Sequence, residues 1–305
     1  MTTDESEGTS EGASREGRAP RPPWGSFRKA LDAAGFHPSR RLGQNFLLDE
    51  NMARAIAADA GIQHGDRVLE IGPGCGFLSV HLAHADAELL AIEVDPRLAP
   101  IASAFLEPYP SARVVLADAL GGKNELGREL VAWLAEAPAT PWRLVSNLPY
   151  SISGPVLALV AARDVPPSSI TVLVQREVGE RLASEAGTPE WGTLGLAVQL
   201  SHTVELGRPV PPGLFWPRPK VESVVVRARL RPGSERASGA ERRATIALAR
   251  ALFTRRRQGL RRVLGDHLDD RERAEAALSA LGLDPARRAE TLTVEEWLAL
   301  TRAVS

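Results

Sequence analysis

Short runs rich in β-branched and other apolar residues alternate with helix-compatible segments from residue 67 onward, and this alternation limits the possible fold more than any other feature. The runs are 67–71, 89–93, 113–116, 143–147 and 170–174, and the helical segments between them are 77–84, 96–107, 124–136 and 153–163. Such alternation is typical of a parallel sheet covered by helices on both faces. After a helix near 175–186, strands at 197–206 and 221–230 have no helix between them and are expected to pair as an antiparallel hairpin. We therefore predict an α/β fold with a mostly parallel sheet.

The regions outside this alternation divide the chain into three predicted parts. Residues 1–24 are rich in Gly, Ser, Thr, Glu and Arg without apolar periodicity, so they cannot bury enough surface to offset their ordering entropy, and we expect a disordered tail. Residues 25–232 hold the alternating pattern, whereas residues 233–305 show helical spacing only. The last helix is expected to begin at a capping box of Thr293 and Glu296. The sequence thus predicts an α/β domain followed by a small all-α domain.

The charge of the chain is distributed unevenly. Its net charge of −1 by itself indicates neither a nucleic acid nor a membrane surface as partner. Residues 208–262, however, carry 15 basic residues against three acidic ones, and 34 of the 37 basic residues of the chain are arginines, which contact phosphates in a bidentate manner. The densest part, called the arginine stripe below, consists of Arg255, Arg256, Arg257, Arg261 and Arg262. A solvated face is the ordinary explanation of such a run, but this density favours phosphate binding, as by an RNA partner.

Several classes of protein are excluded or disfavoured by composition. A single cysteine, Cys75, rules out an internal disulfide and a cysteine-rich zinc site. His81 and His84 would share a helix face, but a pair without a third ligand usually marks a solvated face, and we expect no metal. No apolar run approaches the roughly 18 residues of a membrane span, and the N-terminus lacks the apolar segment of a signal peptide. We expect a cytoplasmic protein that does not bind a membrane.

A glycine-rich turn, Gly72-Pro73-Gly74-Cys75-Gly76, follows the first strand of the pattern. Glycines at a strand-to-helix turn allow the backbone to approach a ligand closely, and the following helix offers unpaired N–H groups. Such a turn also occurs wherever a strand simply joins a helix, so the evidence is weak when taken alone. Cys75 is interpreted as a small filler, because no His or Lys that would activate it is adjacent.

Two acidic residues strengthen the case for a nucleoside at this turn. Glu93 ends the second strand, where it can accept hydrogen bonds from both ribose hydroxyls, and Asp118 follows the third strand, where it can hold an adenine amino group. A surface carboxylate at Glu93 and a helix cap at Asp118 are the alternatives. The pattern resembles that of class I S-adenosylmethionine methyltransferases, which implies a Rossmann-like sheet. A nicotinamide-dependent oxidoreductase is disfavoured, because Phe77 stands where the dinucleotide motif requires a glycine.

The fourth strand ends in Asn147-Leu148-Pro149-Tyr150, a sequence suited to methylation of an adenine amino group. The lone pair of adenine N6 is delocalised into the ring, so a site that methylates N6 must accept hydrogen bonds from the amino hydrogens. The side-chain oxygen of Asn147 and a backbone carbonyl at Leu148 or Pro149 can do this, and Tyr150 can stack on the base, a contact worth about 1–3 kcal/mol. No strong base is required, because the methylated amine loses its proton readily, so catalysis depends on positioning. An ordinary proline turn is the alternative.

Taken together, these segments resemble the ribosomal RNA adenine N6,N6-dimethyltransferases, and within them the bacterial small-subunit branch. The resemblance covers nearly all of the chain from about residue 40 to residue 300. The matching segments are 41–47, 70–76, 93–95, 118–119, 147–151, 175–178, 215–223 and 288–290. Thr193 and Gly195 depart from the pattern, since the family usually has a basic residue and Ser there, and residues 121–140 are longer than the usual connection. None of these departures touches the predicted catalytic residues.

The resemblance implies roles for individual residues. Asn45 and Leu47 would belong to an N-terminal segment that closes over the cofactor, although they could also simply lead into a helix. Phe215 would pack on the second face of the target base, with a core position in the hairpin as the alternative. Further contacts to S-adenosylmethionine would come from Gly72, Gly74, Glu93, Asp118 and Asn147. The expected catalytic set is Asn147, Leu148, Pro149, Tyr150 and Phe215.

The implied reaction is transfer of four methyl groups from S-adenosylmethionine to two adjacent adenosines in the 3′-terminal hairpin of 16S ribosomal RNA, in an assembling small subunit. We expect the enzyme to act as a monomer, with the arginine stripe binding the RNA. Two alternatives remain: a 23S-directed adenine N6-methyltransferase of the antibiotic-resistance type, and a non-catalytic RNA-binding assembly factor. The latter would be indicated by loss of Asn147 or Tyr150, and both residues are present.

Overall fold

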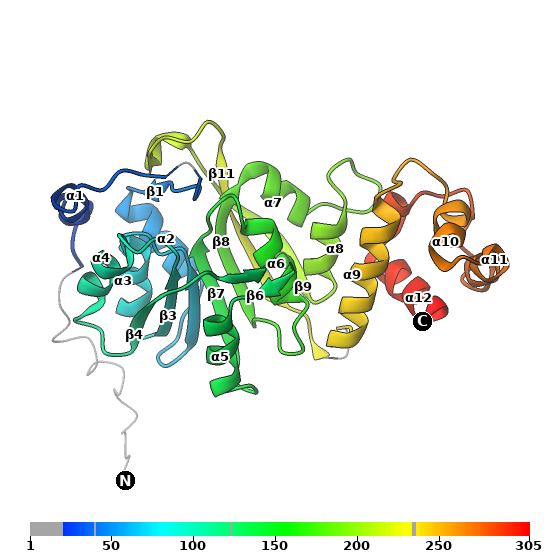
Figure 1. Cartoon of the computed structure of the whole chain (residues 1–305), viewed down its shortest axis with the longest axis horizontal. Helices are drawn as coiled ribbons and strands as arrows, with labels where there is room; N and C mark the ends of the chain where they lie inside the picture. Colours follow the sequence, from blue (N-terminus) through cyan, green and yellow to red (C-terminus); the bar gives the residue numbers. More distant parts are fainter. Residues whose placement is uncertain (1–20, 40, 123, 234–235) are drawn as a thin grey trace, which may run out of the picture.

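A seven-stranded sheet with the order β4-β3-β2-β7-β8-β11-β9 forms the centre of the computed structural model, which describes residues 21–39, 41–122, 124–233 and 236–305 (Figure 1). Its strands are β2 Arg67–Ile71, β3 Glu88–Glu93, β4 Ala112–Leu116, β7 Trp142–Asn147, β8 Ser169–Gln175, β9 His202–Val210 and β11 Ser223–Leu230. The first five strands in this order are parallel, whereas β11 runs antiparallel to both β8 and β9. The predicted mostly parallel α/β sheet and its antiparallel pair are therefore confirmed.

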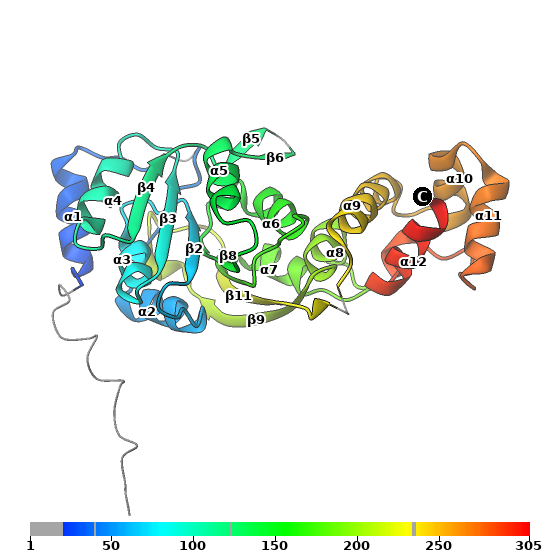
Figure 2. The ribbon, with the colours of Figure 1, turned by 90° about the horizontal axis from the view of Figure 1, so that it is seen from below.

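Helices cover both faces of the parallel part of the sheet (Figures 1 and 2). They are α2 Glu50–Asp59, α3 Phe77–His84, α4 Ala99–Leu106, α5 Arg128–Glu136, α6 Ser153–Ala161 and α7 Arg176–Leu182. A further helix, α1 Trp24–Ala33, packs on α3 and α4, where the ring of Phe27 contacts those of Phe77 and Phe105. Side chains alternate between the faces of a strand, so Val68 packs with residues of α1, α2 and α3, whereas its neighbour Leu69 packs with residues of α5 and α6. Because both faces are buried, apolar residues lie on both faces of the inner strands, although β2 also contains Arg67 and Glu70.

The sequence prediction was wrong at several element boundaries, and two of these change the type of structure formed. Residues 197–199, expected to begin a strand, end helix α8 Thr193–Gln199, and β9 starts only at His202. The reason is tertiary: Leu196, Ala197 and Leu200 are buried with helical spacing in a core shared with the C-terminal helices. The helix expected over 124–136 begins at Arg128, because a small hairpin of β5 Leu120–Gly122 and β6 Glu125–Leu126 precedes it.

The C-terminal helices form a group at the far end of the molecule from α1 (Figure 1). They are α9 Gly239–Phe253, α10 Leu260–Leu268, α11 Arg271–Ala280 and α12 Val294–Val304, with a short 3-10 turn at Ala289–Thr291. The capping box of Thr293 and Glu296 is confirmed. Their core also contains Trp191 and Leu196 from the preceding part of the chain, so apolar packing continues across the predicted division near residue 232. That division remains a prediction.

The N-terminal part of the chain returns to the proline-rich loop of the β9–β11 hairpin. A two-residue strand, β1 Phe46–Leu47, pairs antiparallel with β10 Phe215–Trp216, directly after the 3-10 turn Pro212–Leu214. We call residues 41–47 the strap. Residues 1–20 of the predicted tail lie outside the described residues, and α1 begins at Trp24.

Candidate active site

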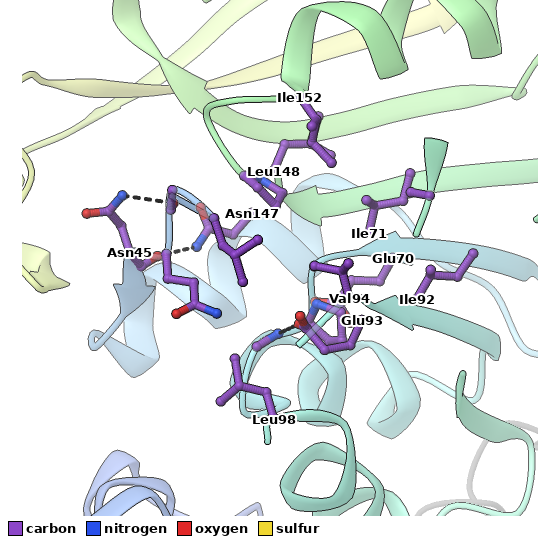
Figure 3. A pocket seen from close by; sticks show the side chains of 18 of the residues that line it. Asn45, Glu70, Ile71, Ile92, Glu93, Val94, Leu98, Asn147, Leu148 and Ile152 are labelled. Carbon is purple, nitrogen blue, oxygen red and sulfur yellow. Dashed lines mark hydrogen bonds between the residues drawn. The ribbon is translucent and has the colours of Figure 1, made fainter. Parts of the chain in front are cut away.

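A cavity opens at the carboxyl ends of β2, β3 and β7, the edge of a parallel sheet where ligands usually bind (Figure 3). It encloses about 1040 Å³ of space between protein atoms, part of which is open to solvent. Volumes of several hundred Å³ are typical of sites for small ligands. The strap, the glycine turn, the end of β3, residues 117–119 and the segment 147–152 all line it. The structure thus gathers at one place motifs that are separated by up to about a hundred residues in the chain.

The glycine turn is shaped by contacts with other parts of the cavity wall. Gly72 has φ +71°, and a Cβ there would lie 2.6 Å from Cγ of Pro149. Gly74 has φ +61°, and a Cβ there would lie 2.8 Å from Cε1 of Phe46. Both the left-handed conformation and the lack of space require glycine. The glycines were predicted to let the backbone approach a ligand. In the structure they let it pack closely against the Asn-Leu-Pro-Tyr segment and the strap.

Glu93 is held rigidly at the end of β3. It is 4% exposed, so the alternative of a surface carboxylate is wrong. One carboxylate oxygen accepts a hydrogen bond from the backbone N–H of Gly74 at 2.9 Å, and the other accepts from that of Asp95 at 2.8 Å. Burial raises the pKa of Glu93 above its usual value. Since each oxygen retains a second lone pair, the carboxylate can still accept hydrogen bonds from a ligand in the cavity.

Asp118 lines the cavity from the loop after β4. Its Oδ1 accepts a hydrogen bond from the backbone N–H of Leu120 at 2.9 Å, which stabilises the turn that leads into β5. Asp118 thus caps a turn rather than a helix. The side chain is exposed and lies beside the apolar wall of Ala117 and Ala119, so its second oxygen remains available to a donor in the cavity.

The strap is fixed over the cavity by polar contacts that the sequence did not indicate. The amide of Gln44 donates to Oδ2 of Asp95 at 2.9 Å, and its own oxygen accepts from the backbone of Ser39 at 2.7 Å. Arg97 also pairs with Asp95, and the pKa of this carboxyl falls to about 2, chiefly because of the hydrogen bond from Arg97. Both Gln44 and Asp95 fall within segments that carry the resemblance, but neither residue type in isolation predicts such a contact.

Asn147 connects the strap to the end of β7. Its Nδ2 donates to the backbone carbonyl of Asn45 at 3.0 Å, as Figure 3 shows. Among the described residues its Oδ1 has no hydrogen-bond partner, so this oxygen is available as an acceptor. The ladder between β2 and β7 ends at Leu69 and Leu144, and beyond it the hydroxyl of Ser146 donates to the carbonyl of Ile71 at 2.6 Å. That bond holds the two strand ends while leaving room for the turn.

The turn after β7 lines the cavity with Leu148, Pro149 and Tyr150. The carbonyl of Pro149 accepts a hydrogen bond from the backbone N–H of Ile152 at 3.1 Å, whereas in the described part of the chain no donor contacts the carbonyl of Leu148. Leu148 is therefore the better of the two candidate acceptors. Tyr150 is half-buried at the cavity wall, and its hydroxyl lies 2.7 Å from Oγ of Ser223. Burial raises the pKa of this tyrosine.

Comparison with known proteins agrees with this geometry. The family model described as ribosomal RNA adenine dimethylase matches residues 35–304. The chain belongs to this family. It is 36% identical over 284 residues to the ribosomal RNA small subunit methyltransferase A of Geobacillus thermodenitrificans, covering 92% of this chain and 95% of the relative. It is 37% identical over 282 residues to the protein of the same name from Leifsonia xyli, covering 90% and 95%.

Two solved structures share the architecture of this dimethylase. One is the 23S rRNA methyltransferase ErmE, with a TM-score of 0.61 and 27% identity over 85% of this chain and 99% of that one. The other is a dimethyladenosine transferase from Plasmodium falciparum, with a TM-score of 0.67 and 22% identity over 84% and 95%. The likeness to the Plasmodium falciparum structure supports the assignment of the fold. The dimethylase is thus a Rossmann-like methyltransferase whose methyl donor is S-adenosylmethionine and whose substrate is ribosomal RNA.

The cavity of the dimethylase fits this methyl donor. It combines the buried carboxylate of Glu93 with an apolar wall of Ile92, Val94 and Leu98. In the same cavity Glu70 is 1% exposed, and its Oε2 has no hydrogen-bond partner within the described ranges. A cavity that offers these groups suits a ligand that carries both a flat apolar part and hydrogen-bonding polar groups.

Phe215 is not where the resemblance placed it. The side chain is 3% exposed, its backbone pairs with that of Leu47, and it belongs to the core cluster beneath the strap. It does not line the cavity. The structure therefore shows the alternative weighed from the sequence, a core residue of the hairpin, because the β1–β10 pair turns this ring inward. In this conformation Phe215 offers no surface at the cavity, and its stacking on the target base stays a prediction.

The arginine stripe is less free than the sequence suggested. Arg255 pairs with Asp266, Arg256 pairs with Glu290 and donates to the carbonyl of Pro189, and Arg261 pairs with Glu275. Arg257 and Arg262 form no ion pair with any described residue. The acidic partners lie outside the run or in later helices, which is why the sequence count alone overstated the available positive charge.

Other residues noted in the sequence have structural surroundings that explain them. Cys75 is fully buried, and burial raises the pKa of its thiol to about 12, which fits a filler rather than a nucleophile. His81 is buried, so the expectation of a solvated face is wrong for this residue. The described residues contain no group of three or more His, Cys, Asp or Glu that could hold a metal ion. None of their helices is long and apolar enough to cross a membrane.

The buried carboxyl group of Glu70 leads to a prediction of how the stability of the protein depends on pH. Burial raises its pKa to about 8, so the folded protein favours the protonated form, and stability is lost as the pH rises from the ordinary value of 4.5 through 8. The loss is about 1.4 kcal/mol for each pH unit in this window. Glu70→Gln mimics the protonated form, so urea unfolding at pH 6 and pH 9 should show a much smaller loss for this variant than for the wild type. Equal losses in both proteins would contradict the prediction, and Glu190→Gln on an exposed loop is the control.

Proposed function

We propose that this dimethylase transfers methyl groups to N6 of two adjacent adenosines in the 3′-terminal hairpin of 16S ribosomal RNA during assembly of the small subunit. The observation that carries the proposal is the amide of Asn147, whose nitrogen is occupied by the carbonyl of Asn45 while its oxygen remains an acceptor at the cavity. The relatives at 36–37% identity are named as small-subunit enzymes, which favours 16S over 23S RNA. We further propose that the enzyme works in the cytoplasm as a monomer.

Cofactor contacts are assigned from the cavity wall. Glu93 would accept hydrogen bonds from the ribose hydroxyls, Asp118 would accept from the adenine amino group, and the backbone of Gly72 and Gly74 would face the remainder of the ligand. The strap, through Asn45 and Leu47, would close over it. Bound S-adenosylmethionine supplies a methyl group on a positively charged sulfur, which makes that methyl a strong electrophile.

The residues after β7 would prepare the target amine for attack. Oδ1 of Asn147 and the carbonyl of Leu148 each accept one N–H of the adenine amino group, which draws the nitrogen lone pair out of conjugation with the ring. Pro149, packed against Gly72, fixes the turn so that both acceptors converge. Tyr150 stacks on the extruded base and offsets part of the cost of removing it from its helix. The proton lost from N6 goes to solvent, so no side chain needs to act as a strong base.

The test is methylation of undermethylated small subunits. Purified protein with S-adenosylmethionine should produce dimethyladenosine in 16S RNA, detected by mass spectrometry of nuclease digests. Large subunits incubated in parallel test the 23S-directed alternative, which the likeness to ErmE keeps relevant. The absence of dimethyladenosine in 16S RNA, or its presence in 23S RNA alone, would overturn the proposal. Inactivity together with tight subunit binding would support a non-catalytic assembly factor.

The ion pairs within the arginine stripe lead to a prediction about RNA binding. Arg257 and Arg262, which lack acidic partners among the described residues, should contact phosphates, so replacing both by Gln should lower the slope of log affinity against log salt by about 1–2. The affinity for subunits is measured by filter binding at several salt concentrations. Replacing Arg113, which pairs with Glu136 on the other part of the molecule, is the control. An unchanged slope in the double variant would indicate a solvated face.

A further inference from the structure

The hydroxyl of Tyr150 contacts a residue far away in the sequence. Tyr150 lies on the turn after β7, whereas Ser223 begins β11, two strands away in the sheet. The two oxygens are 2.7 Å apart. Ser223 is 1% exposed, and its backbone is opposite Gln175 of β8 on one side and Val210 of β9 on the other. The side chain of Tyr150, which lies on a turn, is thus anchored to Ser223, which is held by a strand on either side.

We propose that Ser223 is a positioning residue for methyl transfer, whose hydroxyl holds the ring of Tyr150 in the orientation on which the target base stacks. The inference rests on the proposed function. Ser223 itself does not line the cavity, so it would act only through the tyrosine.

The geometry of a tyrosine explains why one hydrogen bond is enough. The hydroxyl oxygen lies on the axis about which the ring rotates, so a partner at this oxygen fixes the direction of that axis. The second side-chain torsion of tyrosine has a broad energy minimum and is poorly fixed by itself. Because the phenolic O–H is conjugated with the ring and prefers its plane, a partner at hydrogen-bond distance also restricts rotation about the axis. A ring held in this way loses little further entropy when a base stacks on it.

The surroundings of the pair allow the bond to persist. Burial raises the pKa of Tyr150, so the phenol remains protonated throughout the neutral range. Ser223 is the first residue of β11, directly after the proline-rich loop whose Phe215 and Trp216 pair with the strap. The same hairpin therefore fixes the strap through its backbone and the stacking ring through its first serine.

A double-mutant cycle tests the inference. Ser223→Ala and Tyr150→Phe each remove the bond but keep the aromatic ring, so each should lower kcat/KM for undermethylated small subunits by about three- to tenfold. Because both changes remove the same interaction, the double variant should be no slower than the more affected single variant. The KM for S-adenosylmethionine should remain unchanged. Ser168→Ala, which removes a serine hydroxyl bonded to Trp142 at the opposite edge of the sheet, should retain wild-type kinetics.

A second readout separates positioning from a merely structural role. An RNA hairpin with 2-aminopurine at the target position reports stacking, because its fluorescence is quenched when the base stacks on an aromatic ring. Both single variants should quench less than the wild type while their melting temperatures stay close to it. Wild-type activity and quenching in Ser223→Ala, or losses that multiply in the double variant, would overturn the inference. If Ser223→Ala does not fold, wild-type activity of Tyr150→Phe overturns it equally. An inactive wild type would instead overturn the proposed function.

Discussion

Replacing Asn147 by alanine is expected to lower the rate of methyl transfer about a hundred- to thousandfold. The substitution removes the oxygen proposed to accept a hydrogen bond from the target amine, and a preoriented group of this kind typically contributes a factor of this size. It also removes the hydrogen bond from Nδ2 to the carbonyl of Asn45, so the strap is held less firmly. We therefore expect cofactor affinity to fall as well, but only severalfold.

Single-turnover methylation of small subunits, together with cofactor titration by calorimetry, measures the two effects separately. Asn51→Ala, at an exposed position of α2, is the matched control and should behave as the wild type. Asn147→Asp keeps an acceptor but cannot donate to Asn45, and it should retain more activity than the alanine variant while binding the cofactor less well than the wild type. A rate for Asn147→Ala within tenfold of the wild type would show that the amine is activated elsewhere.

Replacing Tyr150 by alanine is expected to lower kcat/KM for RNA by about ten- to a hundredfold and to leave cofactor affinity within about twofold. The ring supplies stacking energy of about 1–3 kcal/mol, and the target base needs this to remain outside its helix. The side chain lies on the wall of the cavity after β7, not at Glu93 or the glycine turn where the cofactor is assigned.

Steady-state kinetics at saturating cofactor and a separate cofactor titration distinguish the two effects. Tyr150→Phe is the matched comparison, because it retains the ring and loses only the hydroxyl, so its loss should stay within the roughly three- to tenfold expected for the hydrogen bond to Ser223. Equal losses in RNA turnover and cofactor affinity would contradict the stacking role and would indicate that the ring supports the whole cavity.

Local patterns predicted most of the scaffold of this dimethylase. The strand Arg67–Ile71 and the helix Phe77–His84 occur at the expected residues, because both their apolar content and the glycines between them are local signals. The strand expected over 197–206 begins only at His202, since residues 197–199 end a helix whose apolar face packs on α9. A short apolar segment is compatible with either structure, so the partner against which it packs decides.

The candidate site shows the same division. Glu93, Asn147 and Tyr150 were found from the sequence because their types and their places at strand ends carry chemical meaning. Gln44, Asp95 and Ser223 were not, because each acts through a hydrogen bond to a residue distant in the chain. The arginine stripe was overestimated for this reason too, since Asp266, Glu275 and Glu290 neutralise three of its members only in the folded protein.

The sequence by itself therefore determined the class of sheet, the glycine turn and the chemical identity of the acceptors proposed for an adenine amino group. These depend on periodicity and on residue type, which are properties of the chain. Tertiary structure alone decided that Phe215 is buried beside the strap. It also decided that the side-chain nitrogen of Asn147 is bound to the carbonyl of Asn45, which leaves its oxygen as the free acceptor. It also decided that Tyr150 is anchored to β11. The physical reason is that hydrogen-bond partners and burial are set by which distant segments meet when the sheet closes.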